Sequence, residues 1–130
     1  MQSRQRKIII LLAHGSKEPY LKKDVIKLKK KLKKCFPVSP SRYLCLYHAF
    51  LQFNKPSLKE CLQKITGSKI VILPLFISQG RHTLYDVKRI IKDIKRRHKY
   101  LDIKLALPLG PHDLIAELLY KRYKEISHQT

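Results

Sequence analysis

Several kinds of residue are scarce in this chain, and their scarcity excludes some classes of protein. The chain has only four glycines and nine acidic residues among 130. Neither glycine-rich nucleotide loop, G-x-x-x-x-G-K-[ST] or G-x-G-x-x-G, occurs in it. A G-x-S-x-G nucleophile elbow is also missing, which argues against an α/β hydrolase. The sequence therefore disfavours an enzyme that depends on a nucleotide.

Cysteine is scarce and scattered. The three cysteines, Cys35, Cys45 and Cys61, are odd in number and show no C-x-x-C spacing. This pattern argues against a disulfide framework and against a thiolate metal site. We expect these residues to be reduced and mostly buried, where they act as small hydrophobic side chains.

Long hydrophobic runs are absent as well. The apolar run Ile8–Ala13 follows Arg4, Arg6 and Lys7, which is the order found in a secretory signal. The run leads at once into His-Gly-Ser-Lys-Glu, however, with no cleavage site, and it is too short to cross a bilayer. The sequence therefore predicts a soluble, cytoplasmic protein that makes no membrane contact.

What the chain has in abundance is positive charge. Its 29 lysines and arginines give a formal net charge of +20. Such a field attracts polyanions, whether nucleic acid, acidic lipid or a small molecule with several carboxylates. The hydrophobic fraction of 44% is ordinary for a globular protein. We predict one domain over residues 1–130, long enough to bury a core.

Hydrophobic patterning alternates between short apolar runs and longer segments with helical spacing. The short runs predict buried strands at Ile8–Ala13, Tyr43–Phe50, Ile70–Phe76 and Ile103–Leu107. The longer segments predict helices from Tyr20 to about Cys35, from Ser57 to before Gly67, from near Thr83 to His98, and from about Asp113 to Glu125. Four strands alternating with four helices predict an α/β fold, in which a four-stranded parallel sheet carries helices on both faces.

Three of these helices carry more specific signals. Ser57-Leu58-Lys59-Glu60 has the pattern of a capping box. Thr83 is placed to cap the third helix, with Asp86 at its third position. The last helix has an apolar stripe at Leu114, Leu118, Leu119 and Tyr123.

Histidines follow three of the four predicted strands. Open parallel sheets bind ligands outside the carboxyl ends of their strands, and there the sequence places His14-Gly15-Ser16-Lys17, Gly80-Arg81-His82 and Gly110-Pro111-His112. Glycine permits tight turns and close approach of a ligand. Imidazole is a common ligand of divalent metals and titrates near neutral pH. The pattern indicates metal handling or proton transfer at this edge, although no local motif such as H-E-x-x-H is present.

With these motifs the chain resembles the small sirohydrochlorin cobaltochelatases, the short-form class II chelatases. The motifs occur in order from about residue 8 to 120: Leu11-Leu12-Ala13-His14-Gly15-Ser16, Pro56-Ser57-Leu58, Leu73-Pro74-Leu75-Phe76, Gly80-x-His82-x-x-x-Asp86, and Leu109-Gly110-Pro111-His112. The resemblance implies a chelatase-like half-domain that forms a homodimer, whose two chains together correspond to one two-domain chelatase. It also implies insertion of Co²⁺, Ni²⁺ or Fe²⁺ into sirohydrochlorin without a nucleotide.

The resemblance further implies roles for individual residues. His14 and His82 match the histidines that bind metal in that family. We hypothesise that they hold the ion loosely and that they, or solvent, accept the pyrrole protons. For the tetrapyrrole we expect Lys17, Arg81 and Lys55 to contact the carboxylates and Leu84 and Phe50 the flat face. Gly15, Ser16, Gly80 and His112 complete the predicted substrate-binding set.

One position departs from the family pattern. Gln52 stands where these chelatases usually carry an acidic residue, and an amide can neither accept a proton nor neutralise a dication as a carboxylate does. His48, in the same segment, is a candidate substitute. A non-catalytic protein that binds metal or tetrapyrrole therefore stays open as an alternative.

Other interpretations need no metal. A basic nucleic-acid-binding module would explain the charge, although its lysines lack the interleaved aromatic residues of single-strand binders. The histidines also have structural interpretations: His14 as a loop residue that bonds its own backbone, His82 as a helix cap beside Thr83, and His112 as part of a helix start. The lysine face of the first helix is most simply a solvated surface.

Overall fold

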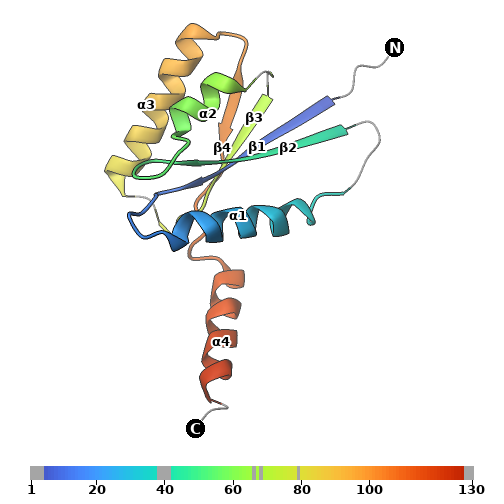
Figure 1. Ribbon diagram of the computed structural model, residues 1–130, viewed down its shortest axis with the longest axis vertical. Coiled ribbons are helices and arrows are strands. Elements are labelled where there is room, and N and C mark those ends of the chain that lie inside the picture. Colours follow the sequence, from blue (N-terminus) through green and yellow to red (C-terminus); the bar gives the residue numbers. More distant parts are fainter. Residues whose placement is uncertain (1–4, 38–41, 66, 68, 79, 128–130) are drawn as a thin grey trace.

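A computed structural model describes residues 5–37, 42–65, 67, 69–78 and 80–127. Strands and helices alternate as β1 (Gln5–Ala13), α1 (Tyr20–Lys33), β2 (Arg42–Phe50), α2 (Leu58–Lys64), β3 (Lys69–Pro74), α3 (Arg81–Arg97), β4 (Asp102–Leu105) and α4 (Asp113–Ser127). The strands form one parallel sheet in the order β2-β1-β3-β4 (Figure 1). The predicted α/β alternation and the parallel sheet are confirmed.

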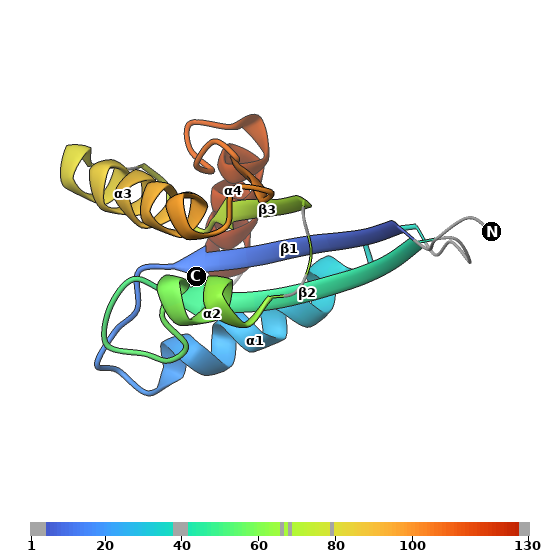
Figure 2. The same ribbon diagram turned by 90° about the horizontal axis from the view of Figure 1, so that it is seen from above.

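Helices cover both faces of the sheet, as predicted (Figure 2). Successive side chains of a strand point to opposite faces, so each strand feeds two cores. The larger core lies under α2 and α3, where Ile10 and Leu12 of β1 pack with Ile72 of β3. The smaller core lies under α1, where Leu11 and Phe50 pack with its Val25. Burial on both faces is why β1 is apolar from Ile8 to Ala13.

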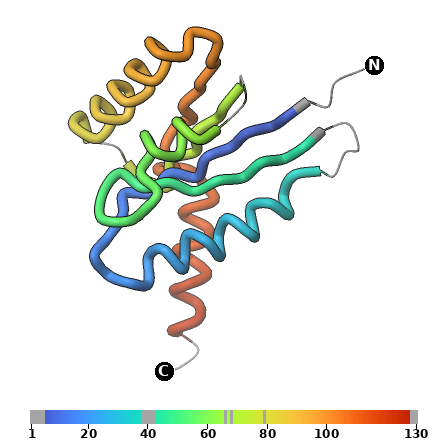
Figure 3. The backbone as a smooth tube through the Cα atoms, turned by 45° about the horizontal axis from the view of Figure 1, so that its top comes forward, coloured from blue at the N-terminus to red at the C-terminus, as the bar shows by residue number. Residues whose placement is uncertain are grey.

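The register brings the carboxyl ends of the strands to one edge. β1 and β2 pair over their full lengths, so that Ala13 and Phe50, the last residue of each, lie opposite one another. β3 pairs with β1 up to Leu12 and Pro74. Figure 3 shows the loops that follow β1 and β2, and the start of α3, on the same side of the molecule, away from the N-terminus. The predicted site residues of these loops therefore share one edge.

The cap predicted for α2 is confirmed. The Ser57 Oγ accepts a hydrogen bond from the Glu60 backbone N–H at 3.1 Å, and the Glu60 Oε1 accepts one from the Ser57 N–H at 3.4 Å. These hydrogen bonds favour the carboxylate form and lower the pKa of Glu60. The capping box fixes the start of α2 next to the carboxyl edge.

The cap predicted for α3 is wrong. The helix begins at Arg81, two residues earlier, with Gly80 as its N-cap. The extended backbone of Gly80 (φ −70°, ψ 162°) already has the geometry of an N-cap, so the helix does not need Thr83 to start it. The Asp86 Oδ1 instead lies 3.8 Å from the Nη2 of Arg89, three residues further along the same helix.

The expectation that the cysteines are mostly buried is also wrong. Cys35 is exposed, Cys45 is half-buried and Cys61 is buried, and all three are free thiols. α1 ends at Lys33, so Cys35 lies beyond its last turn instead of on its apolar stripe. Burial raises the pKa of the Cys61 thiol to about 11.

α4 stands apart from the rest of the molecule, and Figure 1 shows it projecting past α1. Within the part of the chain that the structure describes, no residue of α4 is buried. The predicted stripe is present, but its large apolar side chains are 48–66% exposed: Leu114, Leu118, Leu119, Tyr120, Tyr123 and Ile126. None of the described helices is long and apolar enough to span a membrane.

Candidate functional site

The loop after β1 carries His14 and is held by the loop after β2. The Gln52 N–H donates to the His14 carbonyl at 2.9 Å, which continues the pairing of β1 and β2 past their ends. The Ser16 N–H donates to the Asn54 Oδ1 at 2.8 Å in a partly buried position. The side chain of Asn54 thus holds the loop after β1 in place. No sequence motif marks this residue, whose only signal is its place two residues before the Pro-Ser-Leu motif.

Gly15 is required by this close packing. Its φ is +96°, a backbone conformation that side chains disfavour, and a Cβ atom there would overlap the Gln52 carbonyl oxygen. The tight turn expected at this glycine is confirmed. Gly80 differs, because its φ is −70° and an added Cβ would meet nothing within 4 Å.

The His14 side chain lies at the edge and leans toward β3. Its ring is exposed, and its centroid lies 4.2 Å from that of Phe76 with an interplanar angle of 33°. Phe76 is buried and follows β3 by two residues. His14 thus packs on the residue that lies two positions after β3 and six positions before His82 in the sequence.

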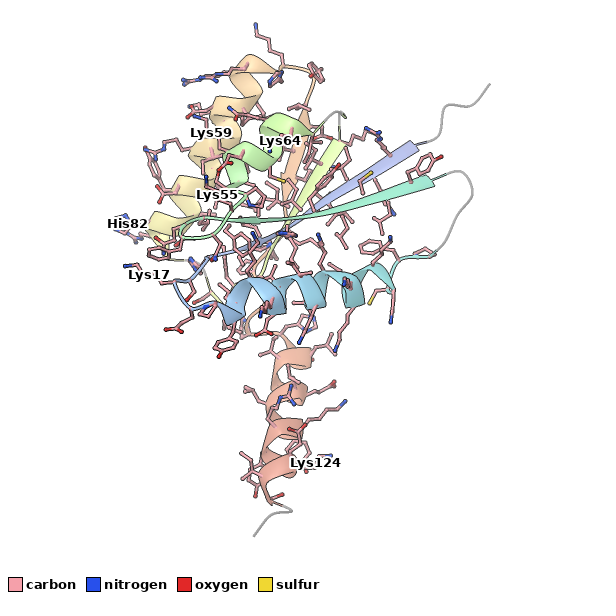
Figure 4. The ribbon with its side chains drawn as sticks, viewed as in Figure 1. Lys17, Lys55, Lys59, Lys64, His82 and Lys124 are labelled. Carbon is pink, nitrogen blue, oxygen red and sulfur yellow. The ribbon has the colours of Figure 1, made fainter. Side chains whose placement is uncertain are left out.

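The start of α3 presents His82 and Arg81 to solvent. His82 is the second residue of the helix and Gly80 is its N-cap, so the interpretation of His82 as a helix cap is wrong. Figure 4 shows His82 and Lys17 at the same end of the molecule, one from α3 and one from the loop after β1. The helix N-terminus and Arg81 make this end electropositive. Leu84 is half-buried one turn into the helix.

The loops also supply cations and an aromatic face. The Lys17 Nζ lies 5.3 Å from the ring centroid of Phe53, which is 59% exposed. Lys55 is exposed on the same loop as Phe53. The Ser16 hydroxyl accepts a hydrogen bond from the Glu18 N–H at 3.0 Å, so it shapes its own loop. An exposed ring among lysines suits a flat ligand that bears carboxylates.

Phe50 does not have the predicted role. Its side chain is 0% exposed and belongs to the core under α1, so its ring has no surface to offer to a ligand. The sequence placed Phe50 correctly at the end of β2, but could not show which face its ring meets. Phe53, three residues later, presents an exposed ring of the kind that the sequence predicted for Phe50.

Two further histidines have structural partners. The His112 Nδ1 accepts a hydrogen bond from the Leu114 N–H at 3.1 Å, which supports its interpretation as part of a helix start. His48 lies within β2, and its Nδ1 is 2.7 Å from the Lys29 Nζ of α1. Burial lowers the pKa of His48, with further lowering by Lys29 and Lys22. The Nδ1 of His48 is therefore occupied and is not free to replace the missing acid at position 52.

The described residues contain no cluster of three or more histidine, cysteine, aspartate or glutamate side chains that could hold a metal ion. The edge offers instead three exposed imidazoles, His14, His82 and His112, and the Nδ1 of His112 already accepts a hydrogen bond. Stable structural metal sites have four protein ligands, whereas sites that exchange ligands leave positions open to water or substrate. A sparse set of neutral nitrogen ligands suits an ion that is passed on.

Solved chelatases share this fold. A CbiX protein of Marinobacter aquaeolei VT8 matches with a TM-score of 0.74 and 25% identity, over 96% of this chain and 99% of that chain. SirB, a sirohydrochlorin chelatase of Bacillus subtilis subspecies spizizenii solved with cobalt, matches with a TM-score of 0.79 and 19% identity, over 94% of this chain and 51% of that chain. The chain thus has the α/β fold of the sirohydrochlorin chelatases.

Sequence comparison gives the family within that class. The CbiX family profile matches residues 8–126. The sirohydrochlorin cobaltochelatase of Saccharolobus solfataricus is 34% identical over 126 residues, which cover 90% of this chain and 93% of the relative. The enzyme of the same name from Saccharolobus islandicus (strain L.S.2.15) is 36% identical over 127 residues, with the same coverage. The chain belongs to the CbiX family, which confirms the predicted resemblance.

Proposed function

We propose that the protein is a metal chelatase that inserts a divalent metal ion into sirohydrochlorin. Membership of the CbiX family and the names of its relatives support this activity. The assignment of residues rests on the position of the His14 ring. The tight turn at Gly15 presents this ring at the carboxyl edge. There the ring packs on Phe76, which lies in the segment between β3 and the helix that carries His82.

The reaction exchanges two pyrrole protons of the macrocycle for one metal ion. The ion is a substrate, and we propose Co²⁺, with Ni²⁺ and Fe²⁺ as alternatives. Neutral His14 and His82 hold it together with water. As the ring nitrogens replace these ligands, two protons pass to the imidazoles or to solvent. Protonated imidazole cannot ligate a metal ion, so protons compete with metal loading. The scheme involves no nucleotide.

The tetrapyrrole is held at its rim and on its face. Lys17, Lys55 and Arg81 are exposed at the carboxyl edge, where they pair with its carboxylates. Phe53 and Leu84 contact the flat ring. Gly80 leaves open space at the start of α3, which lets the macrocycle approach the backbone.

We propose that two copies of the chain form the working unit. SirB has the same fold within a chain about twice as long, and this chain covers 51% of it. A homodimer of the present chain would have the same amount of structure. This pairing agrees with the homodimer implied by the family resemblance.

The test is metal insertion followed in the visible spectrum. Purified protein is mixed with sirohydrochlorin and Co²⁺, and the rate is compared with the rates of His14→Ala and His82→Ala. We expect each variant to lose about 100-fold or more, the range for groups that ligate or move protons. His98→Ala is the matched control, because His98 follows the other end of the helix that carries His82, and we expect it to keep the wild-type rate.

Two results would count against the proposal. Equal rates in the wild type and in both histidine variants, with unchanged circular dichroism, would rule out His14 and His82 as the metal-handling pair. A single turnover per chain would favour the binding-protein alternative, which the amide of Gln52 keeps open.

A further inference from the structure

α1 carries a line of lysines that the proposed reaction does not use. They recur at intervals of four, three and four residues, which places them along one side of the helix. All four are exposed, and we call them the lysine ridge: Lys23, Lys27, Lys30 and Lys34. The opposite side of α1 carries the apolar residues that pack on the sheet, among them the buried Val25. At 1.5 Å per residue the ridge is roughly 16 Å long.

No acidic side chain neutralises the lysine ridge. α1 has seven lysines and a single acidic residue, Asp24. Within the part of the chain that the structure describes, the ion pairs between side chains lie on α3 and α4, and α1 takes part in none of them. α3 is also rich in cations, but there Asp86 and Asp93 each lie beside an arginine. The positive charge of α1 therefore has no partner among the described residues.

Helix stability does not explain the lysine ridge. Consecutive ridge lysines lie three or four residues apart, where like charges repel each other and destabilise a helix. Lys23 also lies near the amino end of α1, where the helix dipole disfavours a cation. Only the lysines near the carboxyl end, such as Lys30, gain from the dipole. An anion bound along the ridge would relieve this repulsion.

The residues of the ridge indicate which kind of polyanion it suits. Binding to a bilayer requires apolar side chains that enter it, but Leu21 and Val25 of α1 already pack in the core. Single-stranded nucleic acid stacks its bases on aromatic rings, and the sequence from Lys23 to Lys34 contains none. A duplex carries one negative charge per about 1.7 Å of its axis, and lysines neutralise its phosphates without aromatic contacts.

We propose that the lysine ridge of α1 binds the phosphate backbone of a nucleic-acid duplex without reading its sequence. With one phosphate per lysine, the ridge neutralises about four phosphates. α1 lies on the face of the sheet opposite α2 and α3 (Figure 1), and the ridge runs from Lys23 away from the carboxyl edge. The duplex and the tetrapyrrole therefore have separate sites, and the inference does not depend on chelation.

The test is the fluorescence anisotropy of labelled DNA and RNA duplexes of one sequence, about 20 base pairs long, titrated with the full chain at about 50–200 mM salt. The ridge variant combines four substitutions: Lys23→Gln, Lys27→Gln, Lys30→Gln and Lys34→Gln. We expect it to bind at least about 10-fold more weakly, and the slope of log K against log salt to become shallower by about 3 to 4. Binding of either duplex supports the ridge, and the tighter of the two identifies the source of the phosphates.

The matched control removes four exposed lysines from the other side of the sheet. They lie on and just after α3 with the same spacing: Lys88→Gln, Lys92→Gln, Lys95→Gln and Lys99→Gln. We expect this variant to lose about threefold or less, because these lysines do not contact the duplex and salt screens their field. The Tm of the ridge variant should equal or exceed that of the wild type, because the substitutions remove repulsion within α1.

Three results would overturn the proposal. Equal losses in the two variants would show that net charge alone attracts the duplex. A wild type that binds neither duplex at about 150 mM salt would remove the partner. Binding to vesicles of anionic phospholipid instead of the duplexes would show that the polyanion is a membrane. Because no chelation is measured, these outcomes are independent of the proposed activity.

Discussion

Two glycines at the carboxyl edge differ in what their positions require. Gly15 has a positive φ and touches the Gln52 carbonyl, whereas Gly80 has an ordinary φ beside open space. We expect Gly15→Ala to lower the free energy of unfolding by about 1–3 kcal/mol and to slow insertion. Gly80→Ala should change stability by no more than about 0.5 kcal/mol. Urea unfolding of both variants checks this pair, and equal losses would contradict the turn geometry.

At the scale of residues, the sequence predicted where the candidate site lies but not which residues hold its loops in place. His14, Gly15 and His82 could be placed because parallel strands all end at one edge. Phe50 could not be oriented, because both faces of the sheet are buried and alternation does not tell one face from the other. Asn54 and Phe53 lie in a loop without a periodic pattern, and their roles depend on contacts with the loop after β1.

At the scale of elements, we expect the contact between α1 and β2 to weaken as the pH falls. Burial and the neighbouring lysines lower the pKa of His48 from its ordinary 6.5. Below about pH 6.5 the unfolded chain takes up a proton at His48 more readily than the folded chain, so the free energy of unfolding falls as the pH falls. His48→Gln keeps an acceptor for Lys29 without titrating. Its Tm should therefore fall less between pH 8 and pH 5, and parallel Tm curves would rule out a contribution from His48.

The helices show which sequence patterns can be interpreted from neighbouring residues alone. The capping box at Ser57 involves only neighbouring residues and was predicted correctly. The cap at Thr83 failed because Gly80, which carries no cap side chain, already adopts the required backbone. The stripe of α4 was found, but a stripe indicates only that a helix has a partner. It does not say whether that partner belongs to the same chain.

At the scale of the whole molecule, the positive charge should act on the substrate. Lys17 is exposed at the carboxyl edge, whereas Lys64 lies in the last turn of α2, which leads away from that edge (Figure 4). We expect Lys17→Gln to raise the KM for sirohydrochlorin up to about fivefold, because a solvent-exposed ion pair contributes at most about 1 kcal/mol. Lys64→Gln, with the same loss of charge, should not change it.

Salt provides the companion measurement for these two lysines. The KM of the wild type should rise with ionic strength as the rim cations are screened, and the KM of Lys17→Gln should rise less. A KM that is equal in both variants and insensitive to salt would show that the rim lysines do not hold the substrate.

The overall architecture was accessible from sequence because each β-α unit carries its own hydrophobic period. The number of chains in the working unit was not, since the charge of +20 indicates the sign of a partner and nothing about its shape. Here only the family resemblance predicts a homodimer, and that pairing stays a prediction.

The main chain of the loop after β2 bonds the main chain of the loop after β1, through Gln52 and His14. The scaffold of the rim therefore does not depend on which side chain stands at position 52. Evolution can exchange an acid for an amide there, or the reverse, while the backbone around His14 keeps its shape. Side chains at the carboxyl edge can therefore change their chemistry while the backbone of the two loops stays the same.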